Sequence, residues 1–220
     1  MPTLLLRLAA PLQSWGGDCK FEIRKTQRAP TKSGVIGLLA AALGWKRDND
    51  EGLIRLNTLK FGVRIDRQGQ NIVDYQTVHG EKTYITYRHY LSDAVFLAGL
   101  ESEDIGFLYE MENALKNPIF PLFLGRRSCP PTLPIVIGIR ESGLEQALTK
   151  EPALIERLNA TNSFRVQLET KDSEVAATCP DVAISFNPQK RCYGYRKVKE
   201  FYVNLVTEVD TEHDAMSELR

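Results

Sequence analysis

The stretch APTKSGVIGLLAAALGW, residues 29–45, joins a Thr-Lys-Ser-Gly turn to a nearly all-apolar run of small residues. It predicts a helix over 33–43, because Thr31 or Ser33 can cap the N-terminus and Gly44 can end the helix. Its glycines and alanines add little side-chain bulk, and its apolar residues lie on nearly all sides. We therefore expect this helix to pack closely against a sheet and to be buried on more than one side.

The same turn raises the question of a nucleotide-binding loop. A Walker A loop requires G-x-x-x-x-G-K-[ST], so that backbone amides wrap the phosphates. Here Pro30 and Thr31 precede Lys32 and Ser33, proline has no amide donor, and the first glycine position falls near Arg24. The Walker loop is therefore excluded. A helix N-terminus with a lysine beside it can still hold a single backbone phosphate.

Strand and helix patterns alternate along the first two thirds of the chain. Their order is β-α-β, a hairpin insert, then β-α-β, which predicts an α+β, ferredoxin-like domain with an inserted β-hairpin. The turn RQGQN separates a strand at 58–65 from one at 71–78, so we expect these two strands to form a hairpin. The other expected elements are strands at 3–10, 93–100 and 133–140 and a helix at 104–117.

The last third predicts a small, β-rich C-terminal extension. A helical stretch at 144–158 precedes three possible strands, which we expect to form a smaller second layer. The expected division is therefore a ferredoxin-like domain over 1–141 and an extension over 142–220. The three strands are expected at 163–170, 181–186 and 200–209.

Charge is balanced overall but unevenly distributed. Twenty-eight basic and twenty-eight acidic residues give zero formal net charge. Residues 17–32 and 189–200 are nevertheless basic, whereas 101–112 and 201–220 are acidic. Local basic segments on a neutral chain suit a groove for a polyanion on a protein that also has protein neighbours. Two ordinary solvated faces are the alternative.

Composition excludes several other classes of protein. The chain has no apolar run of 18 residues, and its apolar N-terminus lacks a basic region and is interrupted by Arg7, so we expect a cytoplasmic protein without membrane contact. The four cysteines are too far apart for a C-x-x-C site and are expected to be reduced. With three scattered histidines, neither a metal site nor a cofactor is expected. G-x-S-x-G and H-E-x-x-H motifs are absent.

Two further segments carry chemistry suited to RNA. FLGRRSCP (123–130) combines two arginines, a glycine and a serine, which suit phosphate or base-edge contacts. The stretch from Tyr75 to Tyr90 interleaves aromatic and basic residues, which can stack unpaired bases while cations hold the backbone. A tyrosine, a histidine and a lysine there can also cleave RNA without metal. A hairpin with its aromatics on an inner face is the structural alternative.

Several of these segments, in this order and spacing, resemble the CasD family. That family is the RAMP-superfamily, ferredoxin-like subunit of the type I-E CRISPR surveillance complex, Cascade. The resemblance is strong over residues 4–140 and loose over the last third. The matching pieces are LRLAAPLQSWG (6–16), the segment from Phe21 to Gly44, DYQTV (74–78), RHYLSDAVF (88–96) and FLGRRSCP (123–130).

The resemblance implies a noncatalytic antiviral subunit that caps one end of the complex and binds the 5′ handle of the CRISPR RNA. A β-hairpin thumb at about 65–90 would reach over that RNA toward the adjacent backbone subunit. The large subunit is a further expected partner, and target DNA is an indirect one. The residues expected to contact RNA are Arg24, Thr26, Arg28, Lys32, Ser33, Tyr75, Arg88, Gly125, Arg126, Arg127 and Ser128.

Two alternatives to this function stay open. Relatives in another CRISPR subtype cut the precursor RNA with a tyrosine, a lysine and a histidine, so Tyr84, Lys82 and His89 mark a possible metal-independent endoribonuclease. The second alternative is a protein-interaction module without any RNA role, on which the basic segments are ordinary surface.

Overall fold

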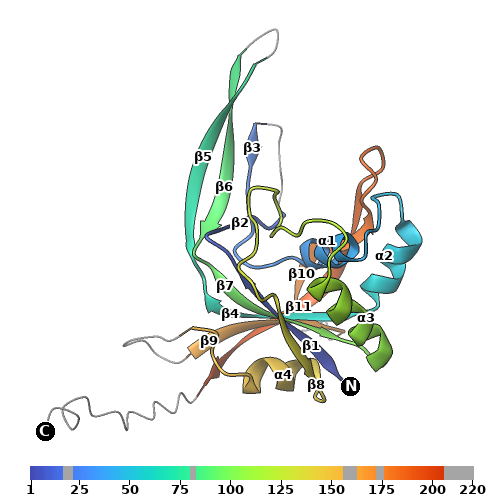
Figure 1. Cartoon of the computed structure of the whole chain (residues 1–220). Coiled ribbons are helices and arrows are strands. Elements are labelled where there is room, and N and C mark those ends of the chain that lie inside the picture. Colours follow the sequence, from blue (N-terminus) through green and yellow to red (C-terminus); the bar gives the residue numbers. More distant parts are fainter. Residues whose placement is uncertain (17–21, 80–82, 156–162, 172–175, 206–220) are drawn as a thin grey trace, which may run out of the picture.

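The computed structural model describes residues 1–16, 22–79, 83–155, 163–171 and 176–205 (Figure 1). Its elements are β1 (Thr3–Ala9), β2 (Leu12–Gln13), β3 (Ile23–Arg24), α1 (Lys32–Ala42), α2 (Asp50–Asn57), β4 (Lys60–Arg67), β5 (Gln70–Val78), β6 (Tyr84–Ser92), β7 (Val95–Glu101), α3 (Ile105–Lys116), β8 (Val136–Arg140), α4 (Leu144–Lys150), β9 (Ser163–Thr170), β10 (Ala177–Ser185) and β11 (Cys192–Asn204). Within this part of the chain, seven strands form an antiparallel sheet in the order β10-β11-β9-β4-β7-β1-β8, and β2, β3, β5 and β6 form a smaller sheet.

Four strands of the large sheet and two helices make the predicted ferredoxin-like unit. Along the chain the order is β1-α1-β4-β7-α3-β8, whereas across the sheet it is β4-β7-β1-β8. Each neighbouring pair is antiparallel. The hairpin β5–β6 is inserted between β4 and β7, at the chain position where the sequence predicts an insert.

Both faces of the large sheet are covered at β1, which explains the continuous apolar run in this strand. Leu4, Leu6 and Leu8 are fully buried in the core cluster that includes α1 and α3. Leu5 points to the opposite face and packs with Leu144 of α4. Successive side chains of a strand alternate between faces, so a Leu-Leu-Leu run is stable only when both faces are covered. Figure 1 shows α1 and α3 on one side of the sheet and α4 on the other.

The first helix forms nearly where its sequence predicts it. It begins at Lys32 and ends at Ala42, and Thr31 is the cap, whose hydroxyl accepts a hydrogen bond from the Gly34 amide at 3.2 Å. Gly44 follows in a positive-φ conformation (+73°), which ends the helix. The helix contacts α2, α3 and β10, so it is buried on more than one side as expected.

The hairpin is made of different strands from those predicted. We expected 58–65 to pair with 71–78, but β4 pairs with β7 and β9, and β5 pairs with β6 along its whole length. The turn at Gln68 and Gly69 therefore passes the chain from the large sheet into the small one. The returning strand β6 lies mostly in the segment 79–90, whose mixed polar and aromatic residues gave no clear strand signal.

The C-terminal strands extend the large sheet, and the second layer that we expected does not form. β9 pairs directly with β4, with Leu168 opposite Gly62, and β11 and β10 follow outward. The edge of β4 away from β7 is open in a bare ferredoxin-like unit. An unpaired edge exposes backbone donors and acceptors, so additional strands are favoured there over a separate layer.

Two helices differ from the sequence prediction. The helix expected over 144–158 ends at Lys150, because Pro152 disfavours a helical conformation at Glu151, which is extended; residues 156–158 lie outside the described part of the chain. The helix α2 was not predicted. Only Leu53 and Leu56 are buried in it, too short a pattern to give a periodic signal.

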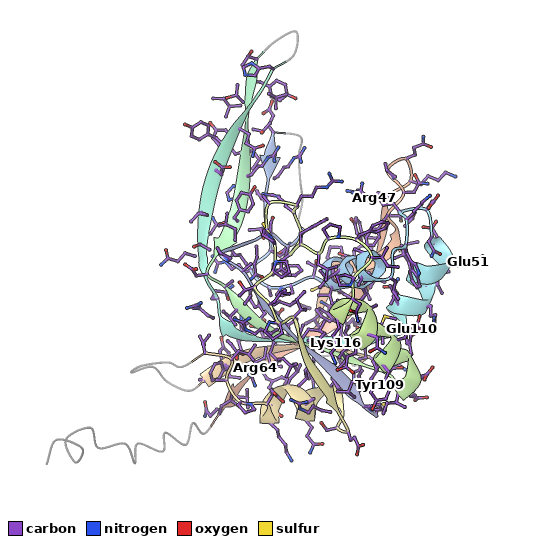
Figure 2. All side chains as sticks on the ribbon, in the orientation of Figure 1. Arg47, Glu51, Arg64, Tyr109, Glu110 and Lys116 are labelled. Atoms are coloured by element: carbon purple, nitrogen blue, oxygen red, sulfur yellow. The ribbon has the colours of Figure 1, made fainter. Side chains whose placement is uncertain are left out.

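A buried arginine ties β4 to the segment after α4. Arg64 and Asp66 have fully buried side chains, and the guanidinium donates to both carboxylate oxygens at 2.7 and 2.9 Å. Arg64 also donates to the carbonyls of Leu148 and Pro152, both at 2.8 Å, and Leu154 donates its amide to Asp66 at 2.7 Å. Figure 2 shows Arg64 on the α4 side of the sheet. This network fixes the connection into the C-terminal strands.

Candidate nucleic-acid interface

The small sheet gathers segments from distant parts of the chain around β6. This strand pairs antiparallel with β5 and β2 and parallel with β3. The basic segment that follows β3 is held in place because Trp15 donates its amide to the Thr26 hydroxyl at 2.8 Å and accepts from the Gln27 amide at the same distance. The outer part of the β5–β6 hairpin projects well beyond the large sheet (Figure 1).

One face of this hairpin exposes aromatic and apolar side chains. Tyr87 lies opposite Tyr75 of β5 on one side and opposite Ile23 of β3 on the other. Their exposed fractions are 46%, 68% and 42% in that order. Opposed residues project to the same face of a sheet, so these three side chains form one patch, here called the aromatic face. The alternative interpretation placed the aromatic residues of this hairpin on a buried inner face. Tyr90 is buried in this way, with 3% of its surface exposed.

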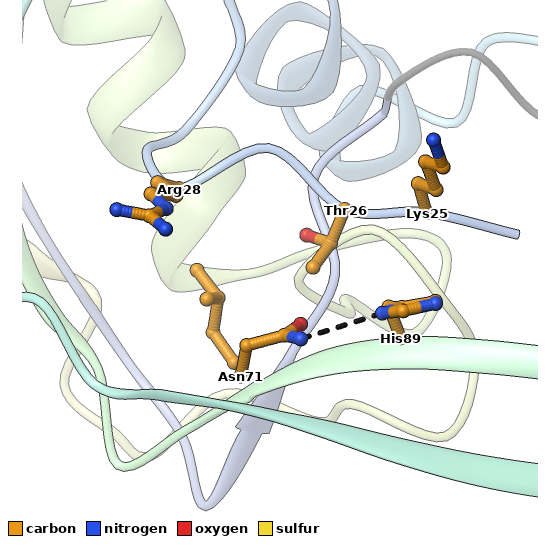
Figure 3. Close-up of a pocket in the computed structure, with 6 residues that line it drawn as sticks. Lys25, Thr26, Arg28, Asn71 and His89 are labelled. Atoms are coloured by element: carbon orange, nitrogen blue, oxygen red, sulfur yellow. Dashed lines mark hydrogen bonds between the residues drawn. The ribbon is translucent and has the colours of Figure 1, made fainter.

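A small pocket lies at the base of the aromatic face (Figure 3). It has a volume of about 190 Å³, and Asn71 and His89 approach each other across it, with 3.4 Å between Asn71 Nδ2 and His89 Nδ1. Two exposed cations, Lys25 and Arg28, stand on its rim. The arrangement offers positive charge and polar groups beside exposed rings. The six lining residues are Lys25, Thr26, Arg28, Asn71, His89 and Leu91.

The loop 123–131 is fastened to this site through Arg126. Its guanidinium donates to the carbonyl of His89 at 3.1 Å and to the carbonyl of Arg24 at 2.8 Å. It also stacks over the ring of Tyr90, 4.7 Å from the centroid. Arg126 therefore joins the loop, β6 and β3, and one N–H of each of its two terminal nitrogens is used within the protein.

The neighbours of Arg126 play different parts. Gly125 has φ +91°, and a Cβ there would stand 1.6 Å from the Ser14 carbonyl oxygen, so only glycine fits this close approach. Arg127 and Ser128 are exposed. Of the two adjacent arginines, Arg127 is thus the one whose charge faces outward.

Lys32 does not belong to this surface. Its side chain is 3% exposed, and its ammonium contacts Glu169 at 2.9 Å and the Asn57 carbonyl at 3.1 Å. Burial lowers the pKa of Lys32 despite the attraction of Glu169. The expected phosphate contact is therefore withdrawn for Lys32, because its charge is directed inward. Ser33 is half-buried beside the helix cap, with its hydroxyl 3.5 Å from the Thr31 hydroxyl.

The other expected residues do gather around β6. Arg24 is exposed on β3 and lies opposite Arg88, which in turn lies opposite Asp74 of β5. Arg88 is half-buried, and its Nε has no hydrogen-bond partner among the described residues. Sequence reasoning omitted Asn71 from the site. Asn71 lies on the same face of β5 as Tyr75, so the pairing of β5 with β6 would have placed it in the site.

Other kinds of site find no support in the part of the chain that the structure describes. Within it, no group of three or more His, Cys, Asp or Glu side chains is placed to hold a metal ion, and no helix is long and apolar enough to cross a membrane. Cys129, Cys179 and Cys192 are free thiols, and Cys19 lies outside the described residues. Burial raises the pKa of the Cys129 thiol, so that group stays neutral.

A ferredoxin-like sheet with an inserted hairpin and basic loops beside it defines a RAMP-type protein. Comparison with known proteins makes this specific: the chain belongs to the family described as CRISPR-associated protein (Cas_Cas5), whose model matches residues 3–199. The resemblance seen in the sequence motifs is therefore confirmed. In Escherichia coli (strain K12), the CRISPR system Cascade subunit CasD is 37% identical over 156 residues, which cover 61% of this chain and 70% of that protein.

Solved structures agree with this family. One, described as a CRISPR RNA-guided surveillance complex, contains a chain that is 30% identical with a TM-score of 0.78, and the match covers 92% of this chain and 90% of that one. Another, described as a Cas protein, is 40% identical with a TM-score of 0.70, covering 92% and 95%. The family model, which extends to residue 199, includes β9, β10 and most of β11, where the sequence resemblance is loose.

Proposed function

We propose that this chain is a subunit of a type I-E Cascade complex and holds the 5′ handle of the CRISPR RNA without catalysing a reaction. The single observation that carries the proposal is the aromatic face standing directly over a cation-rimmed pocket. Family membership and the name of the Escherichia coli relative support the assembly. The adjacent backbone subunit and the large subunit are the proposed protein partners.

The chemistry of the site suits unpaired RNA. Tyr75 and Tyr87 present rings on which bases stack, while Lys25 and Arg28 attract the phosphate backbone. The polar edges of Asn71 and His89 are placed to contact a base edge or a 2′-hydroxyl. Such an arrangement binds a single strand through stacking and charge, and pocket groups add selectivity.

The geometry of β6 favours a noncatalytic role. Tyr84 and His89 are five residues apart on one strand, so they project to opposite faces and lie roughly 16 Å apart along it. A general acid and base must both reach one scissile phosphate within hydrogen-bond distance. Lys82, the third residue of the endoribonuclease alternative, lies outside the described residues.

The test uses the assembled complex. The chain is co-expressed with the other subunits encoded beside its gene and with a CRISPR RNA, then purified through a tag on this chain. The variant is Tyr75→Ala/Tyr87→Ala; the control is Tyr109→Ala/Tyr202→Ala, whose tyrosines are 50% and 69% exposed on α3 and β11. The variant complex should retain less CRISPR RNA than the control complex. In a parallel titration of the purified, RNA-free chain, the affinity for an isolated handle oligonucleotide should fall by roughly 30-fold or more in the variant and stay unchanged in the control.

Two results would contradict the proposal. A wild-type complex that assembles without RNA, or a variant that binds the handle as tightly as its control, would remove the handle-binding role. Incubation of the purified chain with precursor RNA in EDTA tests the second part of the proposal, that the chain does not cleave RNA. Specific cleavage that is lost on His89→Ala would establish the endoribonuclease instead.

A further inference from the structure

A second basic segment, 189–200, takes no part in the proposed handle site. It forms the tip of the β10–β11 hairpin and the first part of β11. Two of its cations are occupied: Arg196 donates to both oxygens of the Asp181 carboxylate at 2.7 and 2.9 Å, and Lys199 contacts Glu145 at 2.7 Å. The remaining three, Lys190, Arg191 and Lys197, are exposed, and no described carboxylate lies within 4.0 Å of them.

Exposed tyrosines stand among these cations. Tyr193 and Tyr195 are 40% and 73% exposed. The register shifts in this hairpin come from extra residues in β10, whereas β11 runs without interruption. Alternation along β11 therefore places Tyr193, Tyr195 and Lys197 on one face, about 7 Å from one to the next. This set, together with Lys190 and Arg191 at the tip, is here called the β11 face.

The hairpin is held by buried contacts, so its face is preorganised. The Asp181 carboxylate that binds Arg196 also accepts the Lys32 amide at 2.8 Å, at the start of α1. Asn57, the last residue of α2, donates its side-chain amide to the Ala183 carbonyl of β10. Arg196 stacks over Phe61, 5.1 Å from the centroid. A rigid scaffold lowers the entropy lost when a ligand orders side chains on it.

We propose that the β11 face binds a single-stranded polynucleotide, as a second contact separate from the handle site. Three exposed cations that no described carboxylate approaches within 4.0 Å complement a phosphate backbone, and two rings at alternate strand positions offer stacking surfaces that tolerate any base. A base in a duplex has both of its faces covered by its neighbours, so stacking on exposed tyrosines favours a single strand. Figure 1 shows the β5–β6 and β10–β11 hairpins projecting from the same side of the large sheet.

The proposal does not rest on the handle-binding function, and the experiment keeps the two apart. Fluorescent 12-nucleotide RNA, 12-nucleotide DNA of the same sequence and the matching DNA duplex are titrated into the purified full-length chain. All proteins carry Tyr75→Ala/Tyr87→Ala, which removes the aromatic face. On this background the test variant is Tyr193→Ala/Tyr195→Ala, and its control is Tyr202→Ala, on the opposite face of the same strand and 69% exposed.

The test variant should bind single strands more weakly, by roughly 30-fold or more, because two stacking rings are removed, with the control unchanged. Arg191→Ala should weaken binding of all sequences and reduce the salt slope by about 0.7 for a single strand. The RNA and DNA arms show whether the ligand is guide-like RNA or displaced DNA. Equal affinity of test variant and control, or preferred binding of the duplex, would overturn the proposal. Loss of partner subunits from the complex with unchanged polynucleotide affinity would make the β11 face a protein contact instead.

Discussion

Arg126 and Arg127 are adjacent and look equivalent in sequence, but the structure predicts that their removal has different consequences. Arg126→Ala should unfasten the loop 123–131 from β6 and β3, because the guanidinium donates to the carbonyls of His89 and Arg24 and stacks on Tyr90. Arg127→Ala should leave the fold intact and remove one outward-facing charge. The pair is thus its own matched control.

The magnitude follows from the contacts of Arg126. A hydrogen bond from a charged donor contributes roughly 1.5–3 kcal/mol, which we reduce to about 1 kcal/mol for each of two bonds because the site is partly exposed. Stacking on the tyrosine ring adds about 0.5–1 kcal/mol. Arg126→Ala should therefore cost about 2–3 kcal/mol, a fall in Tm of roughly 4–12 °C for a chain of this size. For Arg127→Ala we expect no change in Tm.

Thermal unfolding and RNA titrations at several salt concentrations measure both effects. Arg127→Ala should reduce the salt slope of RNA binding by about 0.7, the value for one phosphate contact on a single strand. Arg126→Ala should weaken RNA binding with faster hydrogen exchange in β3 and in residues 123–131. The reasoning is refuted if the two variants have the same Tm, or if Arg126→Ala changes only the salt slope.

Two further predictions concern stability. Gly125→Ala should lower the free energy of unfolding by about 2–3 kcal/mol, because its Cβ would meet the Ser14 carbonyl and the positive φ is strained for alanine; urea unfolding measures this, and an unchanged midpoint would contradict it. The pKa of Lys32 is lowered by burial, so between its folded value and the ordinary value of about 10.5 the unfolded chain holds a proton that the folded chain has released. The stability of the wild type relative to Lys32→Met should therefore rise as pH increases through this window. A flat difference would contradict a lowered pKa, and a falling one would show that attraction to Glu169 outweighs burial.

Local chemistry was sufficient to predict parts of the fold. The first helix begins after Thr31 and ends before Gly44, almost where the capping roles of these two residues predict. Capping depends only on residues within one turn of the helix end. The predicted pairing of 71–78 with 58–65 was wrong, because we assumed that a strand pairs with the one before it in the sequence; β5 pairs with β6 instead. The turn at Gln68 and Gly69 fits either arrangement, and only packing in the large sheet favours β7 and β9 as the partners of β4.

The sequence by itself determined the ferredoxin-like order, the ends of α1 and α3 and the family, because these depend on local periodicity and on motifs in a fixed order. It identified most segments of the candidate interface, but it could not assign the role of each charge. The ammonium of Lys32 is paired with the carboxylate of Glu169, 137 positions away in the sequence. The guanidinium of Arg126 donates to carbonyls of β3 and β6. Whether a cation faces solvent or the interior depends on partners brought together only by the tertiary fold, and burial then decides whether its charge is available to a ligand.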